Sequence, residues 1–412
     1  MARAFLILGG TMIPANRRTL AAALTAATLA LLSGGARAAE PFKLVIGGDA
    51  YTEAGFVSQD RDNGLRTTEF RNRMRLVFTP SAKADNGLEY GARLRVRASS
   101  GSGSTDADRA FLFANGSFGM IRLGMVNSYN DDIWVARPID YLPLASSDGV
   151  AAWLPGSPTL INGRYAGTDL AVAPGAGSAL QHSITVQGTS TKIVYYSPRF
   201  AGLQAGLSYT LRNDSTATDV NRVKAASAAN SGATTNFQDI VELGLHYKNS
   251  FDGVDVAASA AYNLGKASAS GSALDRYQDL RAFQIGGRVG YAGFSLGAGY
   301  VDYGKSGQNK NSAYAPFRDG ARGWNVGVQY VTGPWTLGGG YVYGQDAGSY
   351  ALRGARKLDV IELGVGYQVA PGLLIQAQYD HVRARSDKAA TTATGSPNDT
   401  GNVALLRSVL TF

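Results

Sequence analysis

Apolar and polar side chains alternate along most of the chain after residue 41, in segments of about ten residues. Alternation places successive side chains on opposite faces of a β-strand. After Ala39 no stretch approaches the roughly 18 apolar residues that predict a membrane-spanning helix. The pattern predicts an all-β transmembrane antiparallel β-barrel of about 16 strands. The expected strands are 42–51, 67–79, 88–98, 108–115, 119–127, 191–197, 203–211, 237–248, 253–262, 279–291, 294–303, 322–331, 335–343, 357–369, 373–382 and 402–412.

Short and long connections alternate between these segments. The short ones are built of residues that favour tight reversals, as at 115–117, 197–202, 249–253, 332–334 and 370–372. The long ones, such as 212–236, 304–321 and 383–401, are rich in small and polar residues. Barrels of this type place short turns in the periplasm and long loops outside the cell. An even strand count with both chain ends at the short turns fits this arrangement.

A five-residue repeat, apolar-Gly-x-x-Tyr, supports the barrel. It recurs at Ala205–Tyr209, Leu243–Tyr247, Leu296–Tyr300, Val326–Tyr330, Leu337–Tyr341 and Leu363–Tyr367. Its first, third and fifth positions share one face, which we expect to contact lipid. The tyrosines would then form two aromatic girdles, one with Tyr209, Tyr300 and Tyr341, the other with Tyr247, Tyr330 and Tyr367. A soluble β-sandwich would have to bury these tyrosines, so the repeat favours the barrel.

The first 38 residues resemble a secretory signal peptide. Arg17 and Arg18 precede an apolar stretch over 20–32, and an A-x-A-like cleavage site ends at Ala38. The stretch is too short to span roughly 30 Å of hydrocarbon as a helix, which disfavours a membrane anchor. Because residues 1–11 lie ahead of the charged region, Met12 is the expected true start. We therefore expect residues 1–38 to be removed and residues 39–412 to form the barrel.

Charge and cysteine content add little beyond this. The whole chain carries 39 basic and 31 acidic residues. Residues 1–38 include four arginines and no acid, so the mature chain would carry 35 basic and 31 acidic residues, a net charge of +4. That excess is too small to indicate a nucleic-acid partner. The absence of cysteine is compatible with passage through an oxidising periplasm.

Two neighbouring strands carry a dense basic array. Arginines alternate with apolar residues in the second and third strands, and Arg122 extends the array to the fifth; they are Arg71, Arg73, Arg75, Arg93, Arg95 and Arg97. An arginine facing lipid at mid-bilayer costs about 2–4 kcal/mol, so we expect the arginines to face the lumen. A turn centred on 81–87 would pair Arg71, Arg73 and Arg75 with Arg97, Arg95 and Arg93. Like charges so paired need water and an opposing acidic surface.

The long connection over 127–190 is the expected acidic surface. Its candidate acids are Asp131, Asp132, Asp140 and Asp148. A connection of this length is far beyond ordinary loops and is usually functional. Acids and bases that face each other across a narrow aqueous gap create a transverse field, which sets ion preference and orients dipolar solutes. A wetted wall without particular selectivity is the alternative interpretation of the arginines.

Three further stretches resemble the family of Gram-negative general porins. Residues 108–113 with 116–124 are similar to its fourth and fifth strands, and residues 193–203 to its sixth and seventh. The last strand, 406–412, ends in Phe412 and resembles the assembly signal of outer-membrane proteins. The resemblance implies a homotrimer with three pores, and an inward-folded third loop at 127–190. It implies export through the periplasm, contact with the assembly machinery, and an outer-membrane location among lipid and lipopolysaccharide.

The expected function is therefore a water-filled channel for ions and small hydrophilic solutes, with a mild preference for anions. Two alternatives remain open. One is a channel selective for a sugar, phosphate or acidic compound, for which the loop offers Trp134, Tyr141, Trp153 and Tyr165. The other is a non-conducting structural or adhesive barrel. No enzyme is expected, because the three histidines lack metal-ligand spacing and there is no G-x-S-x-G motif. No cofactor is expected.

Overall fold

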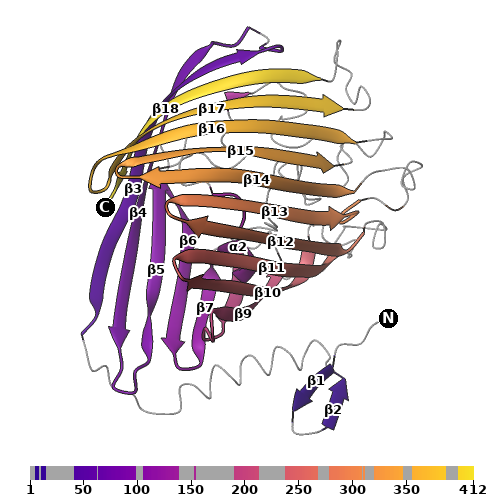
Figure 1. The fold of residues 1–412 in the computed structure, drawn as a ribbon. Helices are drawn as coiled ribbons and strands as arrows, with labels where there is room; N and C mark the ends of the chain where they lie inside the picture. The colour runs from indigo at the N-terminus through magenta and orange to yellow at the C-terminus, as the bar shows by residue number, and fades with distance from the viewer. Residues whose placement is uncertain are drawn as a thin grey trace.

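The sixteen expected strands form one closed barrel (Figure 1). The structure is a computed structural model that describes residues 5–8, 11–14, 41–62, 64–98, 105–138, 153–154, 190–212, 237–267, 278–308, 310, 320–346, 355–386 and 398–412. The strands are β3 (Lys43–Gln59), β4 (Thr68–Lys83), β5 (Glu89–Ala98), β6 (Thr105–Gly116), β7 (Gly119–Met125), β8 (Thr191–Tyr196), β9 (Leu203–Arg212), β10 (Phe237–Phe251), β11 (Val254–Ala267), β12 (Leu280–Tyr291), β13 (Phe294–Gly304), β14 (Ala321–Thr332), β15 (Trp335–Asp346), β16 (Arg356–Ala370), β17 (Leu373–Ser386) and β18 (Asp399–Thr411).

Every barrel strand pairs antiparallel with the strands that precede and follow it. The barrel closes where β18 pairs with β3. At this seam the Gly48 amide donates to the Phe412 carbonyl at 2.8 Å, and the Phe412 amide donates to Gly48 at 3.1 Å. Because closure pairs the first strand with the last, the barrel has no free edge. The predicted all-β barrel of 16 strands is confirmed.

The two faces of each strand differ as the alternation predicts. The outward side chains are large and apolar and lie exposed, such as Phe70 at 76% and Leu112 at 61%. Aromatic rings pair across neighbouring strands on this face. Phe294 stacks on Tyr330 with centroids 4.2 Å apart, and Trp324 lies 5.0 Å from Tyr341. An apolar, aromatic outer face is what a lipid environment requires.

Short turns gather at one end of the barrel, the end at which the chain terminates (Figure 1). The turns Ala201–Gly202, Asp252–Gly253 and Ala292–Gly293 each place two residues at positive φ. This is the conformation of the tight two-residue hairpin, whose twist matches that of the strands. Every connection at the opposite end except that between β3 and β4 includes a stretch of several residues outside the described part.

Near the chain's start, β1 (Phe5–Leu8) and β2 (Thr11–Pro14) pair with each other as a separate two-stranded sheet. The expected cleavage site at residues 36–39 lies outside the described residues, so the signal peptide stays a prediction. In the described part of the chain no helix has the length and apolar character to cross a membrane.

Candidate functional site

The seven predicted arginines lie on the luminal face of three strands. We call Arg71, Arg73 and Arg75 of β4, Arg93, Arg95 and Arg97 of β5, and Arg122 of β7 the arginine wall. Their neighbours in sequence point outward, as shown by the exposure of Phe70, Met74 and Leu94. Two arginines that the sequence reasoning did not include, Arg109 of β6 and Arg407 of β18, lie beside the wall.

The predicted pairing between β4 and β5 is wrong by four residues. Arg75 lies opposite Arg97, and Val77 lies opposite Arg95. The turn that sets this register is closed by the Ala84 amide donating to Leu88 O at 2.8 Å. It lies beyond the centre that was expected, so one arginine pair is directly opposed instead of three. An even shift keeps every side chain on its face, so the arginines still share the lumen.

The acidic partners of the arginine wall come mostly from the neighbouring strands β3 and β6. On β3, Asp49 contacts Arg73 at 2.9 Å and Arg75 at 2.7 Å. Glu53, four residues further along β3, contacts Arg407 at 2.6 Å. Arg73 and Arg75 thus have an acidic partner on the barrel itself, in addition to the acids expected from the third loop. The signal was in the sequence, because Asp49 and Glu53 occupy the same alternate positions of the first strand.

A β-bulge brings two more carboxylates onto the wall. The register between β5 and β6 shifts after Arg95, which lies opposite Arg109, while Arg97 lies opposite Asp106. Asp108 occupies the extra position, so both aspartates reach the lumen. Arg95 contacts Asp108 at 2.6 Å, and Arg97 contacts Asp106 at 2.9 Å. Alternation alone could not reveal this, since a bulge breaks the period of two.

An aromatic ring also separates two arginines on this luminal surface. The ring of Tyr51 lies between two guanidinium groups, with Arg407 at 3.9 Å and Arg73 at 4.8 Å from its centroid. A cation over an aromatic face is attracted to its quadrupole. Tyr51 therefore holds two like charges apart on the luminal surface.

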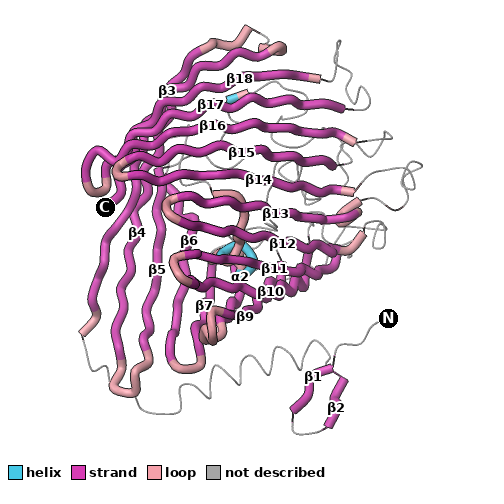
Figure 2. Tube along the Cα trace, in the orientation of Figure 1, coloured by secondary structure: helices cyan, strands magenta, loops and turns pink. Residues whose placement is uncertain are grey.

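The first part of the third loop, which joins β7 to β8, lies against the opposite wall. Its short helix α2 (Tyr129–Asp132) contacts β8, β9 and β10 (Figure 2). From there residues 133–137 pass over β11, β12 and β13 to β14, where Arg137 N donates to Asn325.

Glycines on the luminal face form a path under this segment. A Cβ built on Gly206 would lie 2.2 Å from the Tyr129 ring, and one on Gly286 would lie 1.9 Å from Val135 O. Gly244, Gly297 and Gly327 are covered in the same way. We call these five residues the glycine path. Four of them, Gly206, Gly244, Gly297 and Gly327, are glycines of the apolar-Gly-x-x-Tyr repeat.

Polar side chains of the wall satisfy the backbone of the loop. Ser208 accepts from Tyr129 N at 2.7 Å, and Ser259 accepts from Val135 N at 2.9 Å. Gln284 donates to Asn130 O at 2.8 Å. Buried backbone groups need such partners. The sequence therefore encodes the course of the loop in the barrel wall as much as in the loop.

An ion pair fixes the end of this segment. Arg137, 1% exposed, pairs with Glu362 of β16, and its Nη2 donates to Glu362 Oε1 at 3.1 Å. Arg288 of β12 donates to the Arg137 carbonyl at 3.0 Å. Breaking one partner of such a buried pair is strongly destabilising. Arg137 thus anchors this part of the third loop to β16.

The predicted loop acids are placed unequally. Asp132 contacts Arg122 at 2.6 Å and accepts from the Tyr196 hydroxyl at 2.5 Å. It touches the wall directly instead of facing it across a gap. Desolvation and the neighbouring Asp132 raise the pKa of Asp131 to about 6. Asp140 and Asp148 lie outside the described residues.

A second described part of the loop returns to the wall at the barrel seam. The Trp153 ring lies on Gly55 of β3, and Leu154 lies on Gly401 of β18. Both belong to an apolar cluster with luminal residues of β15 to β18, namely Val342, Leu358, Val360, Val382, Ala384, Val403 and Leu405. The described loop residues thus cover the luminal face from β8 to β14 and again at the seam, and Asp132 contacts Arg122 of the arginine wall.

This site is an aqueous passage with a charged wall. Among the described residues, no group of three or more His, Asp and Glu side chains could hold a metal ion. The chemistry available is electrostatic: rows of guanidinium groups on one wall and an anchored loop on the other. Side-chain charge of this kind acts on ions and polar solutes that pass it.

Comparisons with known proteins agree with the geometry. An uncharacterised protein of Rickettsia conorii is 25% identical over 256 residues, which are 54% of this chain and 56% of that protein. One from Rickettsia prowazekii is 24% identical over 258 residues. The chain spans about half the length of these curated relatives.

Solved structures show the same fold. The anion-selective porin of Comamonas acidovorans matches with a TM-score of 0.58 at 13% identity, over 90% of this chain and 100% of that one. OmpT of Vibrio cholerae in its trimer form matches with a TM-score of 0.57 at 14% identity, over the same shares. A triple mutant of the Rhodopseudomonas blastica porin gives 0.52 at 16% identity, again over 90% and 100%. Residues 21–387 match the family described as Gram-negative porin, so this outer-membrane barrel belongs to the Gram-negative porin family.

Proposed function

We propose that the chain forms a water-filled channel through the outer membrane that passes ions and small hydrophilic solutes and mildly prefers anions. One observation carries the preference. Nine luminal arginines lie on β4 to β7 and β18 in the described part of the chain, and the ion pairs that they make involve five carboxylates. Seven of the arginines share Asp49, Glu53, Asp106, Asp108 and Asp132, and Arg93 and Arg109 have no ion pair with a described residue.

The position of the loop supports the same proposal. Because the described third loop is anchored along the opposite wall, ions would pass beside the arginines. A positive surface in a confined aqueous space raises the local concentration of anions. The similar Comamonas porin is described as anion-selective, which is a property of that protein and agrees with the proposal.

The oligomer and its surroundings belong to the same proposal. We expect a homotrimer, as in the trimer form of the Vibrio OmpT. At the long-loop ends of the strands, cations such as Arg322, Arg383 and Arg385 occupy alternate positions beyond the outer aromatics. Such a belt would suit the phosphate groups of lipopolysaccharide. Export by the 1–38 leader and recognition of Phe412 by the assembly machinery complete the expected route.

Single-channel recording in planar bilayers tests the channel itself. A large conductance that is linear in voltage and in salt concentration is expected. A barrel that inserts as an intact heat-modifiable oligomer yet gives no conductance would favour the structural or adhesive alternative. Saturating conductance blocked by one solute would favour a selective channel.

A further inference from the structure

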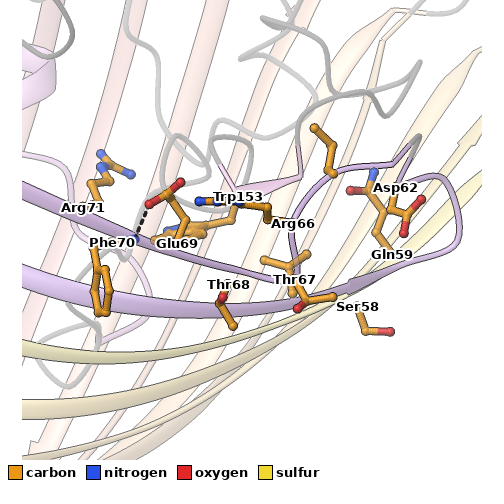
Figure 3. Close-up of a pocket in the computed structure, with 12 residues that line it drawn as sticks. Ser58, Gln59, Asp62, Arg66, Thr67, Thr68, Glu69, Phe70, Arg71 and Trp153 are labelled. Atoms are coloured by element: carbon orange, nitrogen blue, oxygen red, sulfur yellow. Dashed lines mark hydrogen bonds between the residues drawn. The ribbon is translucent and has the colours of Figure 1, made fainter.

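A cavity of about 520 Å³ lies at the long-loop end of the barrel, beside β3, β4 and the connection between them (Figure 3). Its lining combines an indole, Trp153, with two guanidinium groups, Arg66 and Arg71. Leu65 and Val57 add apolar surface. Its volume falls within the range of about 300 to 1,000 Å³ that is usual for small-molecule sites.

Trp153 is built into this site. It is 7% exposed, and its ring lies flat enough against Gly55 that any Cβ there would overlap it, with three ring carbons within 2.6 Å. Opposite Gly55 on β4 lies Glu69, two residues before Arg71. Because Gly55 has no side chain, it leaves the space that the indole occupies, and the indole lines the same cavity as Arg71, the first arginine of the wall.

Several buried donors at and near the cavity have no hydrogen-bond partner among the described residues. The indole Nε1 of Trp153 and the Nη1 of Arg71 have no partner among the described residues. Nor do the Tyr51 hydroxyl and the Arg73 Nε, on the next pair of positions across β3 and β4. The Arg71 Nε lies 3.7 Å from Glu53, too far for a hydrogen bond. Each of these groups can donate to a ligand oxygen.

The two carboxylates of the cavity already accept hydrogen bonds from the backbone. Asp62 accepts from Gly64 N at 3.0 Å, and Glu69 accepts from Phe70 N at 2.9 Å. The lining therefore carries two guanidinium groups and two carboxylates, and each carboxylate has one oxygen bound to a backbone amide. The Arg71 guanidinium can bind an oxygen-bearing anion, and a flat apolar group suits the indole of Trp153.

We propose that this cavity is a binding site for small amphipathic organic anions, with the carboxylate on Arg71 and the apolar body against Trp153. The proposal rests on the proposed channel and gives it a substrate class. Arg71 is shared between the cavity and the arginine wall, so a bound carboxylate lies at the start of the row of guanidinium groups. Anions of this class would be concentrated at the mouth and then pass along the wall.

Benzoate and acetate, which carry the same charge, test the site in the full-length protein. In planar bilayers with chloride as carrier, benzoate is expected to reduce the single-channel current at concentrations at least about tenfold below those of acetate. Benzyl alcohol, which has the ring without the charge, should block as weakly as acetate. Benzoate binding to the detergent-solubilised oligomer, followed by calorimetry, gives a second readout.

Three variants locate the effect. Trp153→Leu and Arg71→Gln should each bring benzoate to within about threefold of acetate. Arg75→Gln removes an equal charge from the wall outside the cavity, so it should shift ion preference yet keep the tenfold discrimination. Arg71→Lys keeps the charge without the planar fork and should retain part of the benzoate effect.

Different results would overturn different claims. Channels that conduct but respond equally to benzoate and acetate would refute the binding site and leave the channel intact. Equal loss of discrimination in Arg75→Gln would show that overall charge, and not the cavity, selects benzoate. A folded oligomer without conductance would refute the channel, and calorimetry would then report on the site alone.

Discussion

Asp131 carries its charge at the point where the third loop meets the arginine-bearing strands. Its carboxyl group lies near Asp132, Arg109 and Lys192. The largest effect on the Asp131 carboxyl group is desolvation, and its pKa is raised from the ordinary value of 3.8 to about 6. Because the folded pKa is raised, ionisation at neutral pH costs stability, and docking of the loop strengthens as pH falls through about 6.

The ion preference should therefore depend on pH. Lowering the pH from about 7.5 to 5 protonates Asp131 and removes one negative charge from the lumen. The reversal potential in a salt gradient should move toward the chloride potential over this interval. Asp131→Asn should show the low-pH preference already at neutral pH and titrate less. Identical titrations of the two proteins would exclude Asp131 as the group responsible.

Single residues also show where sequence reasoning reached its limit. The luminal orientation of Arg71 and Arg93 follows from alternation and the cost of arginine in lipid. The partner of each arginine does not, because it depends on register. A turn displaced toward Leu88 changed the partners, and the bulge at Asp108 added a carboxylate that no regular strand would present.

At the scale of elements, the first described segment of the third loop is held by the ion pair of Arg137 with Glu362 and by the glycine path beneath it. Arg137 and Glu362 are both almost fully buried. Replacing Arg137 by Ala leaves a buried carboxylate unpaired, at a cost of about 3–5 kcal/mol. We expect the loop to detach from β16, with larger and noisier single-channel currents.

Two controls accompany that prediction. The double variant Arg137→Met with Glu362→Met removes both charges and should recover quiet channels. Arg97→Gln breaks an ion pair that is about half exposed and should change loop noise little. Quiet, unchanged currents in Arg137→Ala alone would contradict the anchoring role.

The glycine path gives a second test at this scale. Gly206→Leu would place side-chain atoms within the Tyr129 ring, whereas Gly287, on the outer face, has nothing nearer than 3.6 Å to a built Cβ. Gly206→Leu should displace α2 and expose the loop to protease, at a cost of at least about 1–3 kcal/mol. Gly287→Ala should leave the cleavage rate unchanged. Equal protease resistance of the two variants would show that the loop does not need the path.

The five-residue repeat carries a second structural signal besides its outward positions. The repeat apolar-Gly-x-x-Tyr was assigned to aromatic girdles through its outward positions. Its inward glycine, as at Gly244 and Gly327, leaves room for the third loop. One repeat thus serves both faces of the wall, and the period of two is what separates them.

For the whole molecule, strand number and order were predictable because the alternation is repeated sixteen times. Each strand is a weak signal, but closure demands that all of them pair. Strand ends were less predictable. β3 runs to Gln59 instead of residue 51, since Thr52, Ser58 and their neighbours mix polarity on both faces near the mouth. The course of a connection as long as 127–190 follows from contacts with distant strands, and local pattern cannot supply it.

The reversal potential across a bilayer in a tenfold gradient of KCl is the most direct test of the arginine wall as the element that sets ion preference. The wild-type channel should prefer chloride mildly. Arg93→Gln with Arg109→Gln, which removes the two arginines that lack an ion pair with a described residue, should move the potential toward potassium while conductance stays within about twofold. Potassium preference in the wild type, or no shift in the double variant, would contradict the account.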